Sequence, residues 1–234
     1  MPDLKIFRRA VGAMLLTGSL VACATATPVD DMRKAVVFDD VNAVQKLLAR
    51  GMDPNQVDAK GDPMLVVAVR EKSAKVIKTL SAAKAIDFDK ANAAGETPLM
   101  MACLLNEPDV VKLLVEQYEV EINKTGWTPL HYAATNGNTG IVKYLLDHSA
   151  YIDAESPNAT TPLMMAARGG HIETVKLLLD EGADMRLRNQ QGMTVIDFAE
   201  RYHQDEIAAG LKSRWQKLYP DLPMAAPAKA GAGK

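Results

Sequence analysis

The feature that most constrains the fold of this chain is a short motif that returns about every 33 residues. The sequence Thr-Pro-Leu begins at Thr97, Thr128 and Thr161, and a weaker copy begins at Thr194, with Val195 in place of proline. The spacings between these threonines are 31, 33 and 33 residues. A unit of this length cannot bury its own apolar face, so the repetition predicts that several units stack side by side.

Each unit carries the signals of two helices. Threonine followed by proline favours the start of a first helix, because threonine caps the helix and proline fits its first turn. Apolar residues spaced three and four apart then form the buried face of a second helix, as in residues 141–146 and 174–179. Gly51 and Gly182 follow two such helices, where the backbone needs a positive φ. The pattern predicts an all-α solenoid of helix-turn-helix units.

These residues resemble the ankyrin repeat, whose pattern is G-x-T-P-L-H-x-A-A, then a second helix, then G-A-D-x-N. The resemblance implies an all-α stack with short β-hairpin fingers between its units. It extends over residues 30–217 and implies units at about 30–60, 61–94, 95–125, 126–158, 159–191 and 192–217. The first and last units are expected to be the N- and C-terminal caps of the stack. Residues 218–234 are rich in proline, alanine and glycine, so we expect a disordered tail there.

The unit at 95–125 departs from the repeat in two ways. It has an additional residue near Tyr118 and Glu119, and it lacks about three residues at the connector Lys124-Thr125. We therefore expect the finger between this unit and the next to be stunted.

Residues 1–26 have the layout of a secretory signal peptide, because three basic residues precede the apolar stretch 10–22. This stretch is too short for a stable transmembrane helix. Two cleavage alternatives remain open. The sequence Leu-Val-Ala-Cys ending at Cys23 resembles a bacterial lipobox, which makes Cys23 a lipidated first residue, whereas Ala-Thr-Ala at 24–26 fits ordinary signal peptidase. We expect a periplasmic protein, anchored to the outer membrane if Cys23 carries lipid.

The sequence contains none of the usual signals of catalysis. The net charge of -2 provides no basic field for nucleic acid. The four histidines and two cysteines lack the spacing of a zinc site, and no glycine-rich phosphate loop occurs. We therefore expect no metal, no cofactor and no enzymatic activity, with an enzyme of unrecognised site as an alternative.

Several residues inside the motif have structural roles. The resemblance implies that His131 ties neighbouring turns by hydrogen bonds. Cys103 replaces the second alanine of the unit, which predicts a small buried side chain. The pairs Met100-Met101 and Met164-Met165 occupy matching positions, where they either fill the core or form an adaptable, oxidisable contact surface.

The resemblance implies a partner protein that binds the fingers and the concave face of the first helices. Trp127 is a large aromatic residue between Gly and Thr, where the fold needs nothing large, and aromatic residues are common at interface hot spots. Leu104 and Leu105 are apolar where solvated residues are usual. The predicted contact set is Trp127, Tyr132, Leu104, Leu105, Asn136, Arg168, Glu96, Thr160 and Met193.

The sequence thus predicts a monomeric, non-catalytic protein-protein interaction module of the bacterial envelope. We expect no nucleic-acid partner, and membrane contact only through a lipid on Cys23. Exported bacterial proteins that this chain resembles include accessory proteins of oxidative-stress defence, and the methionine pairs favour that role. The alternative is an immunity protein that neutralises a secreted toxin.

Overall fold

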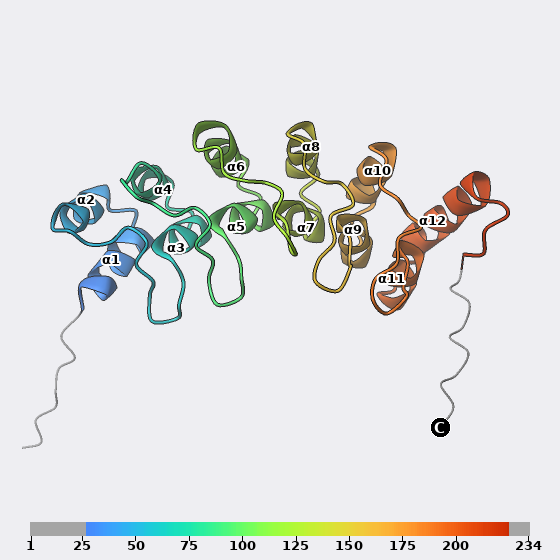
Figure 1. The fold of residues 1–234 in the computed structure, drawn as a ribbon, viewed down its shortest axis with the longest axis horizontal. Helices are drawn as coiled ribbons and strands as arrows, with labels where there is room; N and C mark the ends of the chain where they lie inside the picture. The colour runs from blue at the N-terminus through green and yellow to red at the C-terminus, as the bar shows by residue number, and fades with distance from the viewer. Residues whose placement is uncertain (1–26, 225–234) are drawn as a thin grey trace, which may run out of the picture.

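The computed structural model describes residues 27–224. The predicted signal peptide, the predicted lipidation site Cys23 and residues 225–234 of the predicted tail lie outside these residues. The described chain forms twelve α-helices and one π-helix, arranged as helix pairs that stack in a single bowed row (Figure 1). The predicted all-α solenoid is confirmed.

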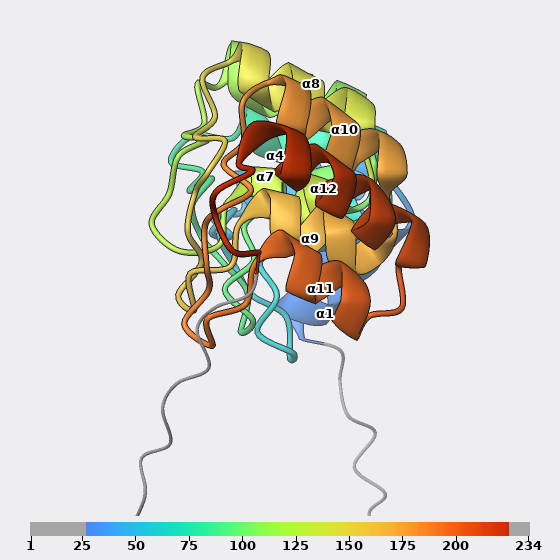
Figure 2. The same ribbon diagram turned by 90° about the vertical axis from the view of Figure 1, so that its right-hand side faces the viewer.

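The two helices of each unit lie in two layers. The first helices are α1 (Pro28–Val37), α3 (Met64–Arg70), α5 (Pro98–Leu104), α7 (Pro129–Thr135), α9 (Pro162–Gly169) and α11 (Val195–Arg201). The second helices are α2 (Val41–Ala49), α4 (Ala74–Ser81), α6 (Pro108–Lys112) continued by η1 (Leu113–Gln117), α8 (Thr139–Asp147), α10 (Ile172–Asp180) and α12 (Asp205–Leu218). The second helices lie on the outer side of the bow (Figure 1), and the connecting loops gather on one side of both layers (Figure 2).

Threonine caps start five of the six first helices, beginning with Thr27 before α1. The Oγ atoms of Thr97, Thr128 and Thr161 each accept a hydrogen bond from the backbone N–H three residues later, and proline follows each of them. Thr194 has no such proline, but its N–H donates to Asp197 Oδ2 at 2.7 Å, and Thr194 Oγ accepts from the N–H of Asp197. This capping box gives the weaker repeat copy a defined helix start.

The small residues of the motif form the seam where the units meet. Ala102, Ala133, Ala166 and Ala199 are completely buried, and so is Cys103, as predicted. Each first helix contacts the first helix of the next unit along this seam, since small side chains let the backbones approach. The core is therefore continuous from unit to unit, as a solenoid requires.

The irregular unit accommodates its additional residue in the second helix. The helix α6 passes into the π-helix Leu113–Gln117, whose wider turns absorb one residue. The chain then leaves the helix with a hydrogen bond from the N–H of Val120 to the carbonyl oxygen of Leu114 at 3.0 Å. The predicted insertion near Tyr118 thus appears upstream of that residue, as a local change of helix type.

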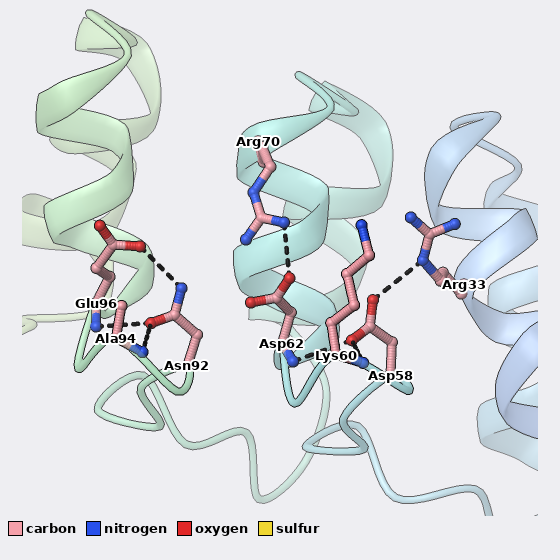
Figure 3. A network of polar contacts seen from close by, with 8 residues as sticks. All are labelled: Arg33, Asp58, Lys60, Asp62, Arg70, Asn92, Ala94 and Glu96. Carbon is pink, nitrogen blue, oxygen red and sulfur yellow. Dashed lines mark hydrogen bonds and ion pairs between the residues drawn. The ribbon is translucent and has the colours of Figure 1, made fainter.

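The fingers differ from the expected β-hairpins. Residues 27–224 contain no strand, and the one bridge outside the helices joins Val57 and Pro63. A side chain closes each full finger instead: Asp58 Oδ1 accepts from the N–H of Lys60 at 2.8 Å and from that of Asp62 at 3.0 Å (Figure 3). Asn92 (Figure 3) and Asn189 each accept the same two hydrogen bonds in their own fingers. Ser156 accepts only the second one, from the N–H of Thr160. Because the side chain takes these N–H groups, each finger is a tight turn and not a two-stranded ladder.

The finger before α7 is stunted, as predicted. Asn55 and Asn123 hold equivalent places, because each binds the connector of the next unit through its side-chain amide. Residues 56–60 separate Asn55 from the tip glycine Gly61, but only residues 124–125 separate Asn123 from Gly126. The closing side chain is therefore absent from this finger, which is visibly the shortest (Figure 1).

The C-terminal cap extends beyond the expected boundary at residue 217. The helix α12 ends at Leu218, and the Trp215 indole N–H donates to the carbonyl oxygen of Leu222 at 3.0 Å. The ring of Tyr219 lies edge-on to that of Trp215 at 5.3 Å. Residues 218–224, which we expected to be disordered, therefore pack against α12, because the buried indole needs a hydrogen-bond acceptor. Among the described helices, none is both long and apolar enough to cross a membrane.

Candidate functional site

The fingers and the first helices together form what we call the inner face. Two positions of each unit, eight residues apart, recur on it: the residue before the N-cap of the first helix, and the residue two places after the buried alanine of that helix. These pairs of positions are Asp62 and Arg70, Glu96 and Leu104, Trp127 and Thr135, Thr160 and Arg168, and Met193 and Arg201. The chemistry of the inner face changes along the solenoid because these residues change.

The N-terminal part of the inner face satisfies its own charges. Arg70 Nη1 donates to Asp62 Oδ2 at 2.7 Å, and Arg33 Nε donates to Asp58 Oδ2 at 3.0 Å (Figure 3). Burial acts to raise the pKa of the Asp58 carboxyl, but the N–H groups of the finger and the Arg33 guanidinium outweigh burial and hold that pKa below its usual value. Glu96 accepts from Asn92 Nδ2 at 2.8 Å.

The C-terminal part of the inner face contains a hollow of about 230 Å³, which we call the inner hollow. Its lining residues come from three successive units: Trp127, Asn158, Thr160, Met165, Arg168, Asn189, Gln191, Met193, Phe198, Arg201 and Tyr202. Four members of the predicted contact set meet here, namely Trp127, Thr160, Arg168 and Met193. They are brought together by the stacking of the units, since they lie up to two repeats apart in the sequence.

Aromatic rings and guanidinium groups line the mouth of the inner hollow. The indole of Trp127 is 36% exposed and lies edge-on to the His131 ring, with 5.2 Å between the ring centroids. The Arg168 guanidinium lies 4.9 Å from the centre of the Tyr202 ring, which is itself 38% exposed. Arg201 Nη1 lies 3.5 Å from Met193 Sδ. These contacts hold the exposed side chains in place without a charged partner.

The other predicted contact residues lie outside the inner hollow. Leu104 and Leu105 are half-buried and pack against the core, so they form less of an exposed apolar patch than expected. Asn136 is exposed, but its Nδ2 donates to the carbonyl oxygen of Leu104 at 3.0 Å. Burial and the charge of Glu96 raise the pKa of the half-buried Tyr132.

The predicted contact set omitted seven residues of the inner hollow, among them Phe198, Arg201 and Tyr202. The available signal was the repeat itself, because Arg201 follows Arg168 by one 33-residue period. The set also included Thr160, whose side chain is buried at 2% exposure. Thr160 lines the floor of the hollow and offers no exposed hydroxyl to a partner.

His131 joins two units beneath Trp127. Its Nδ1 accepts from the backbone N–H of Thr128 at 3.2 Å, so Nε2 carries the proton and donates to the carbonyl oxygen of Thr160 at 2.8 Å. Burial lowers the pKa of His131 to about 4, and the ring is neutral at physiological pH. The structural role implied by the resemblance is confirmed.

The remaining reactive groups are held in the core. Burial raises the pKa of the Cys103 thiol far above its usual value, which keeps it protonated. The four side chains of the pairs Met100-Met101 and Met164-Met165 are at most 6% exposed, so core filling accounts for them. Over residues 27–224, no three His, Cys, Asp or Glu side chains are grouped to hold a metal ion.

A family model described as ankyrin repeats (3 copies) matches residues 32–125, 84–158 and 150–217. The chain belongs to the ankyrin-repeat family. Domains of this family are typically non-catalytic scaffolds that bind other proteins. The ankyrin-repeat stack also resembles the crystal structure of the ankyrin-repeat protein EF0377, with a TM-score of 0.67 and 25% identity over 79% of this chain and 97% of that one.

Relatives known from sequence share only part of their length with this ankyrin-repeat protein. Alpha-latrocrustotoxin-Lt1a from Latrodectus tredecimguttatus is 41% identical over 26% of this chain and 4% of its own length. Protein VAPYRIN-LIKE from Medicago truncatula is 26% identical over 56% of this chain and 29% of its own. The chain spans less than a third of the length of either relative, so the similarity is one of repeats.

Proposed function

We propose that this ankyrin-repeat protein is a non-catalytic interaction module that binds a partner protein at the inner hollow. The observation that carries the proposal is the placement of Trp127, Arg168 and Tyr202 around one concave hollow, each side chain exposed yet held by a neighbour. Tryptophan, tyrosine and arginine are the residue types that most often dominate the binding energy of interfaces.

The repeat stack prepares this surface for binding. His131 fixes the backbone on both sides of Trp127, because it bonds to Thr128 in one unit and to Thr160 in the next. A side chain that is already ordered loses little conformational freedom when a partner binds, which favours affinity.

We also propose that the protein acts in the bacterial envelope. Support comes from the sequence of residues 1–26, where a basic segment, an apolar stretch and small residues follow one another. Protein recovered from the envelope fraction of its source bacterium should lack this segment. The mass of its first peptide distinguishes a lipid on Cys23 from cleavage after Ala26, and recovery of an intact Met1 in the cytoplasm would contradict export.

Affinity capture with the purified protein tests the binding surface. Wild-type protein should retain a partner from the envelope fraction, and Trp127→Ala should weaken that interaction at least about tenfold, in line with the loss of a hot-spot residue. The matched control is Tyr151→Ala, which removes a 69% exposed aromatic ring from the same unit but away from the inner hollow. A partner lost with Tyr151→Ala but kept by Trp127→Ala would place binding elsewhere.

A further inference from the structure

The inner face carries an arginine at the same place in three units, two residues after the buried alanine of the first helix: Arg70, Arg168 and Arg201. In the unit at 61–94, the carboxylate of Asp62 lies within hydrogen-bond distance of Arg70, at 2.7 Å. That arginine is therefore neutralised by its own unit, from the position eight residues earlier (Figure 3).

Arg168 and Arg201 have no carboxylate in the position that Asp62 holds for Arg70. The position eight residues before Arg168 is Thr160, and the one before Arg201 is Met193, so neither unit supplies a carboxylate there. Within residues 27–224, both arginines are exposed. The Arg168 guanidinium contacts the Tyr202 ring, and the Arg201 guanidinium contacts Met193 Sδ. By contrast, four other arginines of the described chain each pair with an aspartate: Arg33, Arg70, Arg186 and Arg214.

The surroundings of this arginine pair favour an anionic ligand. The lining of the inner hollow includes two arginines, three aromatic rings, two methionine thioethers and several neutral polar side chains. It includes neither aspartate nor glutamate. The whole chain carries a net charge of -2, so the positive charge here is local to the hollow and does not reflect a basic chain. Arginine recognises carboxylates through paired N–H donors, and such contacts strengthen where apolar groups exclude water.

The spacing of the groups indicates the shape of the ligand. Arg168 and Arg201 belong to neighbouring first helices, whose axes in packed helices lie about 8–10 Å apart. An extended peptide advances roughly 3.3 Å per residue, so two carboxylates about three residues apart match the two arginines. Trp127 lies one unit before Arg168, which places an apolar side chain of the same segment against the indole.

We infer that the inner hollow binds an extended acidic segment of the partner protein, with two carboxylates at Arg168 and Arg201 and an apolar side chain at Trp127. The inference rests on the proposed function and specifies its chemistry. Arg70 is the internal control for this site, because it holds the same position in its own unit but is paired with Asp62 and lies outside the inner hollow.

Selection of random peptides displayed on phage tests the inference without knowledge of the natural partner. Peptides selected on the wild-type protein should be enriched in aspartate and glutamate about three residues apart, next to an apolar residue. The double variant Arg168→Gln, Arg201→Gln should bind the selected peptides at least about tenfold more weakly. Arg70→Gln is the matched control and should bind them like the wild type, with circular dichroism confirming that each variant is folded.

Ionic strength provides a second readout with the same peptides. Raising it from about 0.01 M to about 0.15 M shortens the Debye length from about 30 Å to about 8 Å, so affinity for the wild type should fall. The double variant should show a smaller change, because its hollow no longer carries the two charges.

The outcomes separate the inference from the proposed function. Selected peptides that lack acidic enrichment, keep their affinity for the arginine double variant and lose it with Trp127→Ala would overturn the inference and leave the binding surface standing. Peptides that bind both variants like the wild type would overturn both proposals, and so would a selection that yields no binder.

Discussion

Among single side chains, His131 gives the clearest link between burial and stability. Its pKa falls from 6.5 to about 4 in the folded chain because burial disfavours the charged ring. Above pH 6.5 the ring is neutral in both states, and its contribution is fully present. As the pH is lowered from 6.5 to 4, the unfolded chain takes up the proton before the folded chain does. The free energy of unfolding should therefore decrease as the pH decreases, by up to roughly 3 kcal/mol for this group.

Urea unfolding across this pH range, followed by circular dichroism, measures the effect. His131→Gln should be less stable than the wild type at pH 7 by about 1–3 kcal/mol, since it loses the bonds to Thr128 and Thr160. It should also lose the extra pH dependence below 6.5. His203→Gln, which replaces an exposed imidazole, is the control for the loss of a histidine at pH 7. Equal pH profiles for the wild type and His131→Gln would show that His131 does not titrate as described.

The turns between paired helices depend on close packing between units. Gly137 has a φ of +68°, and a Cβ atom there would lie 2.4 Å from Nδ1 of His171. The same His171 ring bonds through Nε2 to the carbonyl oxygen of Thr135 at 2.9 Å. Gly137→Ala should therefore destabilise the protein by about 2 kcal/mol or more, because the left-handed backbone and the clash both oppose a side chain.

Gly140 is the matched control for this turn. It lies three residues later, inside α8, with nothing within 4 Å of a Cβ atom built on it. Gly140→Ala should stabilise the protein by about 0.5–1 kcal/mol, because alanine loses less backbone entropy in a helix. Thermal unfolding of the two variants should move in opposite directions, and a shared direction would contradict the packing described at His171.

The solenoid should unfold first at its terminal units. Each unit contacts only its neighbours, so damage at the C-terminal cap is felt first by the units next to it. Trp215 is 3% exposed and anchors residues 218–224 to α12. Trp215→Ala should cost about 3–5 kcal/mol, as expected for a buried aromatic side chain. Amide hydrogen exchange should rise in α11 and α12 before it rises in α3 and α5.

Trp127→Ala is the comparison for this prediction, because Trp127 is 36% exposed and belongs to a central unit. It should change the free energy of unfolding far less than Trp215→Ala and leave exchange in α12 unchanged. Uniform acceleration of exchange over all the described helices after Trp215→Ala would show that the stack unfolds as a single cooperative unit.

Much of this architecture was predictable, because its signals are short and repeated. The Thr-Pro starts, the burial of Cys103 and the stunted finger at Asn123 follow from residues compared at equivalent places in each unit. The closure of the fingers by Asp58 and its counterparts was not predicted. A side chain that accepts two backbone N–H groups leaves no mark on the hydrophobic pattern, so periodicity does not reveal it.

The candidate site was predicted only in part, for a different reason. Trp127 and Arg168 stood out one at a time, but the hollow they share with Tyr202 forms between units. Leu104 looked exposed by position, yet it packs against the core, because burial depends on the neighbouring unit.

Local chemistry along the chain was sufficient to define the repeat, its helix starts and the need for several units to stack. Those features depend on interactions within one unit, which the motif records each time it returns. The inner hollow emerges only when the units are placed side by side in space, because its lining comes from three successive units. The stacking also brings Arg168 and Arg201 to the same hollow, and that is a property of the packed stack.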